Sequence, residues 1–384
     1  MKTPKKNLTS LNNQIENSNS IVIKIGSALL FNKKTNKTND KWVKSLVEDI
    51  YRLHRFGKKI VIVSSGSIVL GRKKLNMVKK PIKLEEKQAA AAVGQIELAQ
   101  FWKSAFDKYK IRTAQILLAP EDTEQRRKHI NARITIQTLL NLNVIPIVNE
   151  NDTVTTYEIR FGDNDRLAAR VAGMISADLV ILLTDIDGLY TSNPHENPDA
   201  KHIPVINNIT QKILNMAENP INEFASGGMI TKLSAAKIAT QSGVSMIICN
   251  GSVNNPISSS VNQKKFSIFL RHITPKNARK NWISGALDPK GSVVLDEGAM
   301  SAIRNGKSLL PVGVIDINGS FQRGDLISIV SKDGIKLGHG LSSFSSEEMY
   351  KIKGLNSIKF EEVLGYESRS ELVHADNLVV VKGS

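Results

Sequence analysis

The sequence is poor in cysteine and contains no long apolar segment. Its one cysteine, Cys249, excludes a disulfide framework and any zinc site built from several cysteines, and it fits a reducing, cytoplasmic environment. No apolar run approaches the roughly 18 residues that a membrane-spanning helix needs. The N-terminus lacks the apolar region of a signal peptide, so we expect residues 1–18 to be a disordered leader.

Aromatic residues are also scarce, at 5% of the chain, whereas basic residues are in excess and give a formal net charge of +16. Much of this excess lies in residues 31–87, where 16 basic residues accompany 5 acidic ones. A nucleic-acid surface would interleave aromatic side chains with such charges. A solvated basic surface, or one that attracts anionic substrates such as nucleotides, agrees better with this pattern.

Short apolar strands alternate with helical patterns through the first two-thirds of the chain. We expect strands over residues 21–25, 60–63, 113–118, 144–148, 179–183 and 245–249. We expect helices over residues 41–56, 84–109, 124–142, 164–176 and 229–242. Strands that are apolar on both faces belong to a mainly parallel sheet covered by helices. The pattern therefore predicts an α/β fold of three layers, with ligands at the carboxyl ends of the strands.

The last third of the chain follows a different pattern. After a stretch rich in Ser, Asn, Pro and basic residues, short strands separated by glycine turns predict a small β-rich domain with one helix at about 297–305. We divide the chain into a catalytic domain over residues 19–260, a linker over 261–287, the small domain over 288–370 and a C-terminal strand or tail over 371–384.

Small residues and charges follow the first two expected strands. The chain contains neither a Walker A sequence nor the catalytic-loop signature of protein kinases. Lys24 and Gly26 end the first strand, where a glycine lets backbone N–H groups approach an anion and the lysine adds positive charge. The segment Ser64-Ser65-Gly66-Ser67 follows the second strand and suits a carboxylate or phosphate, although a helix cap would use the same residues.

Carboxylates and amides gather in the middle of the chain, in Asn149-Glu-Asn-Asp152 and in residues 161–165. Some of these side chains can cap a helix, but their number exceeds what a turn needs. The remainder could bind an ammonium group or a magnesium-bound nucleotide. Two further segments could contact a nucleotide: Thr184-Asp185 through Tyr190, and the paired glycines of residues 226–232, which open a helix that contains Lys232.

Taken together and in this order, these motifs resemble the amino acid kinase family. The resemblance rests on Val61-Ile-Val-Ser-Ser-Gly-Ser, on Asn149-Glu-Asn-Asp with Gly162-Asp-Asn-Asp, and on Gly227-Gly-Met-Ile-Thr-Lys. It covers about residues 20 to 375 and extends to bacterial members that phosphorylate glutamate, which the chain resembles in more detail. The C-terminal part is similar to a PUA domain, a small β-barrel often found in RNA-modifying proteins. It carries Asp296-Glu-Gly-Ala and Leu309-Leu-Pro-Val-Gly-Val.

The resemblance implies transfer of the γ-phosphoryl group of ATP to the side-chain carboxylate of L-glutamate, the first step of proline biosynthesis. It assigns catalysis to Lys24, Lys232 and Asp165. It assigns glutamate binding to Ser65, Asp152 and Asn164. It assigns ATP binding to Lys24, Thr184, Asp185, Ser226, Gly227, Gly228, Met229, Ile230, Thr231 and Lys232. Magnesium would bridge the phosphates through water, and we predict no dedicated protein ligand for it.

The same resemblance implies a cytoplasmic homo-oligomer, a dimer or tetramer, with proline as a feedback inhibitor and a glutamyl-phosphate reductase as a further partner. Within the family, the acceptor could instead be aspartate, N-acetylglutamate, carbamate or UMP. Outside it, the chain could be an RNA-binding protein with a regulatory kinase-like part. We do not expect RNA as a partner, because residues 276–384 contain 14 basic and 13 acidic residues and are nearly neutral.

Overall fold

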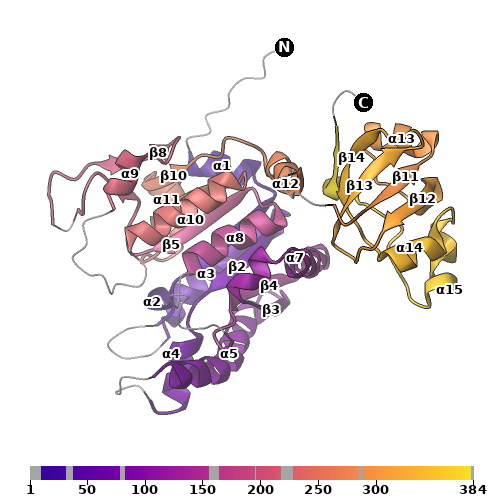
Figure 1. The fold of residues 1–384 in the computed structure, drawn as a ribbon. Helices are drawn as coiled ribbons and strands as arrows, with labels where there is room; N and C mark the ends of the chain where they lie inside the picture. The colour runs from indigo at the N-terminus through magenta and orange to yellow at the C-terminus, as the bar shows by residue number, and fades with distance from the viewer. Residues whose placement is uncertain are drawn as a thin grey trace. The chain divides into compact units, whose positions relative to one another are not determined.

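The computed structural model describes residues 10–31, 38–77, 83–154, 164–194, 196–217, 228–284 and 289–381 (Figure 1). It divides into two compact units, the first of residues 1–124 and 131–275 and the second of residues 125–130 and 276–384. Among the described residues, the first unit contains two sheets and two hydrophobic cores, and the second contains one sheet and one core. Among the described residues, no helix is long and apolar enough to cross a membrane.

An eight-stranded sheet forms the centre of the first unit, in the order β3-β4-β2-β1-β5-β9-β10-β8. Its strands are β1 (Ser20–Ile25), β2 (Lys59–Ser64), β3 (Thr113–Leu118), β4 (Ile145–Glu150), β5 (Leu179–Thr184), β8 (Val205–Ile206), β9 (Ser245–Asn250) and β10 (Phe266–Phe269). The first six strands of this order are parallel, and β10 is antiparallel to β9. The carboxyl ends of the parallel strands therefore meet at one edge of the sheet.

Alternating side chains along each strand feed two separate cores, one on each face of the sheet. In β1, Ile21 and Ile23 belong to the core that also contains residues of α3 and α5, whereas Val22 belongs to the core that contains residues of α8 and α10. This three-layer arrangement confirms the fold class predicted from the sequence. Lys24 has the same parity as Val22, so its side chain points toward the layer of α8 and α10.

Helices cover both faces of this sheet (Figure 1). They are α1 (Leu11–Asn17), α2 (Ser27–Leu30), α3 (Asp40–Arg55), α4 (Ser67–Lys74), α5 (Leu84–Asp107), α6 (Pro120–Glu124), α7 (Arg126–Asn141), α8 (Asn164–Ile175), α9 (Gln211–Asn215), α10 (Met229–Gln241) and α11 (Pro256–Gln263). A two-stranded ribbon of β6 (Leu189–Tyr190) and β7 (His202–Ile203) follows β5.

Residues 10–18 differ from the disordered leader that we expected there. Ser10 caps α1 by accepting a hydrogen bond from the backbone N–H of Asn13, and the helix buries Leu11 and Ile15 in the core. These two apolar residues are one helical turn apart, so one face of a short helix can pack while the other stays polar. Residues 1–9 lie outside the described part of the chain.

The expected linker also contains regular structure. β10 lies within residues 261–287, and its residues are buried between β9 and β8. The sheet of the first unit therefore extends beyond residue 260. The expected tail contains β15 (Leu378–Val380), which pairs with β14.

The second unit contains a five-stranded sheet in the order β12-β11-β13-β14-β15. Its other strands are β11 (Gly291–Leu295), β12 (Val314–Gly319), β13 (Leu326–Ser331) and β14 (Lys336–Leu341). Its helices are α12 (Pro275–Ser284), α13 (Glu297–Arg304), α14 (Ser346–Ile352) and α15 (Phe360–Leu364), with three 3₁₀ turns at 311–313, 357–359 and 375–377. The small β-rich domain expected from the sequence is thus present, and α13 is its expected helix, but α14 and α15 were not expected.

Candidate active site

The candidate site lies at the carboxyl-end edge of the first sheet, where β1, β2, β4 and β5 end. Because these strands are neighbours and parallel, the loops that follow them come together although they are far apart in the sequence. Helices α8 and α10, which pack against each other, begin at the same edge. The side chains that the sequence singled out lie at these strand ends and helix starts.

Two lysines from distant parts of the chain contact one carboxylate. Lys24 Nζ lies 2.6 Å from Asp165 Oδ1, and Lys232 Nζ lies 3.2 Å from Asp165 Oδ2. Thr231 Oγ1 makes a longer contact of 3.4 Å with Asp165 Oδ2. The side chains of Lys24, Lys232 and Asp165 are 14%, 7% and 4% exposed, so the cluster is nearly enclosed. The two ammonium groups therefore contact different oxygens of one carboxylate near the end of β1.

The electrostatics of this cluster follow from its composition. Burial alone would raise the pKa of Asp165, because a buried carboxylate loses hydration. The charges and hydrogen bonds of Lys24 and Lys232 outweigh burial and hold the pKa of this carboxyl below its usual range. Two ammonium groups against one carboxylate leave net positive charge at the sheet edge. Such a site attracts a phosphate group.

A chain of amide and hydroxyl groups lies beside the lysines. Asn164 Nδ2 donates to Ser65 Oγ at 2.6 Å and to Asn149 Oδ1 at 3.0 Å. Asn149 Nδ2 donates to Ser67 Oγ at 3.2 Å, and Ser67 Oγ donates to Asp152 Oδ2 at 3.2 Å. These hydrogen bonds thus link the residues at the ends of β2 and β4 to the first residue of α8.

Two acceptors in this series of hydrogen-bonded side chains can accept a hydrogen bond from a ligand. Asn164 is 3% exposed, and its buried Oδ1 has no hydrogen-bond partner among the described residues. Burial raises the pKa of Asp152, and the hydrogen bond from Ser67 offsets this only in part. A buried acceptor without a partner is costly, so a ligand that brings an N–H donor would be stabilised here.

Close packing of α4 on α5 fixes the loop that carries Ser65 and Ser67. A Cβ atom on Gly94 would lie 1.7 Å from the backbone oxygen of Ser67, and one on Gly71 would lie 1.7 Å from that of Ala90. Only glycine allows the two helices to approach this closely. Ser67, the first residue of α4, is therefore held by the backbone of α5 as well as by its hydrogen bonds.

The segments expected to contact a nucleotide end at the same edge. Thr184 closes β5 and donates through Oγ1 to Asp185 Oδ1 at 2.9 Å. Gly228 is the N-cap residue of α10, whose first turn carries Met229, Ile230 and Thr231. Among the described residues, no atom would lie within 4 Å of a Cβ placed on Gly228. Backbone N–H groups at a helix start favour an anion.

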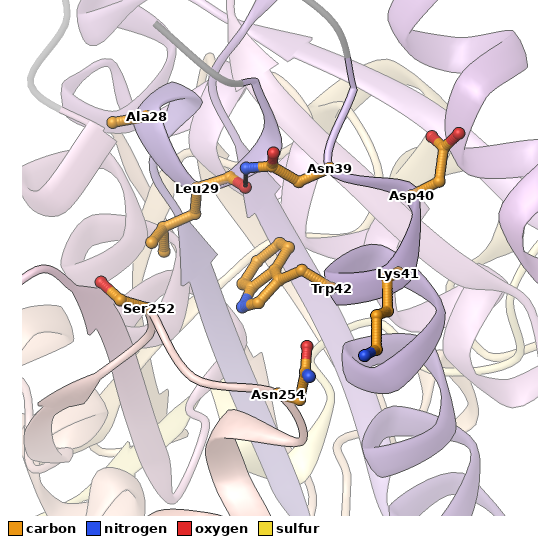
Figure 2. A pocket seen from close by; sticks show the side chains of 8 residues that line it. All are labelled: Ala28, Leu29, Asn39, Asp40, Lys41, Trp42, Ser252 and Asn254. Atoms are coloured by element: carbon orange, nitrogen blue, oxygen red, sulfur yellow. Dashed lines mark hydrogen bonds between the residues drawn. The ribbon is translucent and has the colours of Figure 1, made fainter.

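A separate pocket of about 420 Å³ lies between α2, the start of α3 and the loop after β9 (Figure 2). Its lining residues are Ala28, Leu29, Asn39, Asp40, Lys41, Trp42, Ser252 and Asn254. Trp42 Nε1 donates to the backbone oxygen of Gly251, and Asn39 Nδ2 donates to that of Leu29. Of the catalytic and binding residues predicted from the sequence, none that the structure describes lines this pocket.

Most residues predicted from the sequence come together here. The three predicted catalytic side chains contact one another, and two of the three predicted glutamate ligands, Ser65 and Asn164, share a hydrogen bond. Ser226 and Gly227 lie outside the described residues, as do residues 161–163. Asn149 and Ser67 lie within the sequence motifs, but the sequence alone assigns them no function. A neutral side chain does not indicate a role until its hydrogen-bond partners are known.

Family models match both units. The model of the amino acid kinase family matches residues 19–250, and that of the PUA domain matches residues 291–364. The chain is 50% identical over 360 residues to a protein of Rhodopseudomonas palustris named glutamate 5-kinase, covering 94% of this chain and 96% of the relative. It is 47% identical over 367 residues to a glutamate 5-kinase of Bradyrhizobium sp., covering 96% of this chain and 97% of the relative.

Solved structures of low sequence identity were also found. A carbamate kinase from Giardia lamblia bound to AMP-PNP has a TM-score of 0.48 and 20% identity, and covers 67% of this chain and 99% of its own. A UMP kinase from Ureaplasma parvum has a TM-score of 0.46 and 18% identity, and covers 66% of this chain and 98% of its own.

Proposed function

The chain belongs to the amino acid kinase family and carries a C-terminal PUA domain, and from this we infer that it is a glutamate 5-kinase. Its reaction is the ATP-dependent phosphorylation of the side-chain carboxylate of L-glutamate, which yields L-glutamyl 5-phosphate and is the first step of proline biosynthesis. The observation that carries this function is the pair of lysines on Asp165, beside a chain of amide and hydroxyl groups that ends in Asp152.

The chemistry requires concentrated positive charge rather than a base. The side chain of glutamate has a reference pKa of about 4.3, so the acceptor is already ionised at neutral pH. The difficulty is to bring this anion to a polyanionic nucleotide and to stabilise the charge that gathers on the transferring group. We assign this stabilisation to Lys24 and Lys232, and we assign to Asp165 the positioning of both ammonium groups.

The amide and hydroxyl chain is suited to glutamate. Ser65 would donate to a carboxylate of the substrate, while Asp152 would accept a hydrogen bond from its α-ammonium group. The buried, unpartnered Oδ1 of Asn164 would accept a second hydrogen bond from glutamate. An ammonium ligand would also relieve the desolvation of Asp152.

The nucleotide would lie along Thr184, Asp185 and residues 226–232, with its phosphates toward Lys24 and the start of α10. Asp165 cannot readily bind magnesium, because its two oxygens contact the lysines. Among the described residues, no group of three or more His, Cys, Asp or Glu side chains could hold a metal. Mg²⁺ usually keeps several waters and binds substrate phosphates, so it would enter with ATP and supply charge neutralisation there.

Further properties are proposed from the family alone. They are a homo-oligomer, inhibition by proline near the glutamate site, transfer of the product to a glutamyl-phosphate reductase, and a cytoplasmic location where ATP and glutamate are available. We do not assign RNA binding to the PUA domain.

The acceptor is tested by measuring ADP release by the full-length protein with a panel of acceptors. We expect release with L-glutamate and much less with aspartate, N-acetylglutamate, carbamate or UMP. In Lys24→Ala and in Lys232→Ala, kcat with glutamate should fall by roughly 100-fold or more, because one donor to the developing charge is lost.

The matched control is Lys103→Met, since Lys103 is 61% exposed and pairs only with Asp107 along α5 among the contacts of the described residues. Turnover with another acceptor but not with glutamate would overturn the proposed substrate. Near-normal kcat in either alanine variant would remove that lysine from the catalytic role.

A further inference from the structure

An ion pair between Asp187 and Lys265 connects the turn after β5 to the residue that precedes β10, outside the site described above. Lys265 Nζ lies 2.7 Å from Asp187 Oδ2, and Tyr190 donates through its hydroxyl to Asp187 Oδ1 at 2.7 Å. Asp187 is two residues beyond Asp185 in the turn, and Lys265 immediately precedes β10. The carboxylate of Asp187 is thus held at both oxygens, once by Tyr190 of the adjoining ribbon and once by the residue that precedes β10.

The residues after Asp187 are fixed by close contacts. Ser267 Oγ accepts a hydrogen bond from the backbone N–H of Leu189 at 2.7 Å and donates to the backbone oxygen of Ile203 at 2.6 Å. A Cβ on Gly188 would lie 2.4 Å from both His202 Nε2 and Ser267 Oγ. The chain from Gly188 onward therefore has little freedom. The orientation of the part of the turn that precedes Gly188 then depends on how Asp187 is held.

The ion pair between Lys265 and Asp187 is only partly buried, and this limits its contribution to stability. The side chain of Lys265 is 56% exposed and that of Asp187 is 19% exposed. Burial would raise the pKa of Asp187, but the hydrogen bonds and charge of Lys265, together with the hydroxyl of Tyr190, hold it below its usual range. Pairs this exposed contribute little to global stability, so the contact is better suited to orienting the turn.

We propose that Lys265 is a positioning residue for the nucleotide. Through Asp187, it holds the turn after β5 in the orientation that presents Thr184 and Asp185 to ATP. This inference rests on the proposed function only in that these two residues contact the nucleotide. It does not depend on which acceptor is phosphorylated.

The test compares Lys265→Met, Lys265→Arg and Lys103→Met in the full-length protein. AMP-PNP with Mg²⁺ and L-glutamate are titrated separately by calorimetry, and KM is measured for ATP and for glutamate. In Lys265→Met, we expect Kd for AMP-PNP and KM for ATP to rise roughly two- to fivefold, the range of one exposed ion pair. The constants for glutamate should stay unchanged, and Lys265→Arg should recover most of the loss.

Lys103→Met is the matched control, because that lysine is 61% exposed and pairs with Asp107 at 3.5 Å within α5. Unchanged nucleotide constants in Lys265→Met, or equal rises for nucleotide and glutamate, would overturn the inference. A wild-type protein that binds AMP-PNP but does not phosphorylate glutamate would refute the proposed acceptor. In that case the calorimetric comparison of the variants would still decide the role of Lys265.

Discussion

At the scale of single residues, the site differs from a simple patch of positive charge because each charged group has a defined partner. Asp165 balances two lysines, whereas Asp152 has only a hydroxyl donor among the contacts described. The two carboxyls are therefore shifted in opposite directions: the pKa of Asp165 lies below its usual range, and that of Asp152 lies above it. The first suits a permanent structural anion, and the second suits an anion awaiting a cation.

Replacing Asp152 by Asn should raise the KM for glutamate by roughly 10- to 100-fold, the size expected for one charge-assisted hydrogen bond. Burial raises the pKa of Asp152, so in the wild type KM should rise as pH falls through that value. Steady-state kinetics measured from neutral pH downward would follow the change, which Asp152→Asn should lack.

The substitution Asp152→Asn should weaken glutamate binding but should not lower the stability of the protein. A carboxyl with a raised folded-state pKa binds its proton more tightly in the native protein, so its ionised form lowers stability above the unfolded-state pKa. Asp152→Asn should therefore keep or raise the midpoint of thermal unfolding at neutral pH. A variant with unchanged KM would exclude Asp152 from the ammonium site, and a lower midpoint would show that Asp152 stabilises the free protein.

At the scale of secondary-structure elements, the long strands and helices were predictable because their apolar residues recur with clear periods. Several short elements were not, and β10 and α1 are two examples. β10 has only four residues, Phe-Ser-Ile-Phe, and begins two residues after Lys264, which has a left-handed conformation. The local sequence therefore does not distinguish it from a loop, and the hydrogen bonds of Ser267 are made with residues far away in the sequence. α1 has a single turn of apolar spacing in an asparagine-rich segment, and its stability comes from packing.

Some residues of the candidate site could likewise be predicted from the sequence, and others could not. The lysines and aspartates could be found from sequence because their motifs carry charge in a recognisable order. Ser67 and Asn149 could not be assigned a role, because their importance lies in a hydrogen bond between α4 and β4, two segments that are far apart in the sequence; the two residues are 82 positions apart. Positions of this kind are set by the parallel sheet, which brings the ends of β2 and β4 together.

The close contact of α4 with α5 allows a prediction about stability and glutamate binding. Gly94→Ala would place a Cβ atom 1.7 Å from the backbone oxygen of Ser67, so the helices must separate. We expect a loss of roughly 1–3 kcal/mol in stability, as for other overpacked sites, and a raised KM for glutamate because Ser67 moves. Thermal unfolding and steady-state kinetics would measure both.

Gly298→Ala in α13 is the control, since the nearest atom to its added Cβ would be 3.4 Å away. If Gly94→Ala kept the unfolding midpoint and the KM of the wild type, the helix contact would not determine the position of Ser67.

At the scale of the whole molecule, the two units have separate cores, and all the described candidate site residues belong to the first. Ile329 is fully buried in the core of the second unit. Ile329→Ala should cost about 2–5 kcal/mol in that unit, as a large-to-small core substitution does. Because no candidate site residue lies there, kcat and both KM values should stay within twofold of the wild type.

Scanning calorimetry and steady-state kinetics of the full-length protein would test this, with Ile181→Ala as the counterpart in the first unit. We expect Ile181→Ala to lower the stability of the unit that catalyses the reaction. A large change in KM caused by Ile329→Ala would show that the second unit contributes to substrate binding.

The parity of β1 has a consequence for how this sequence can change over time. Lys24 reaches Asp165 only because it is an even number of residues away from Val22. Deleting one residue between them, without a shift in strand register, would turn the ammonium group into the opposite apolar layer. Evolution can therefore exchange one aliphatic residue of this strand for another far more freely than it can shorten the strand.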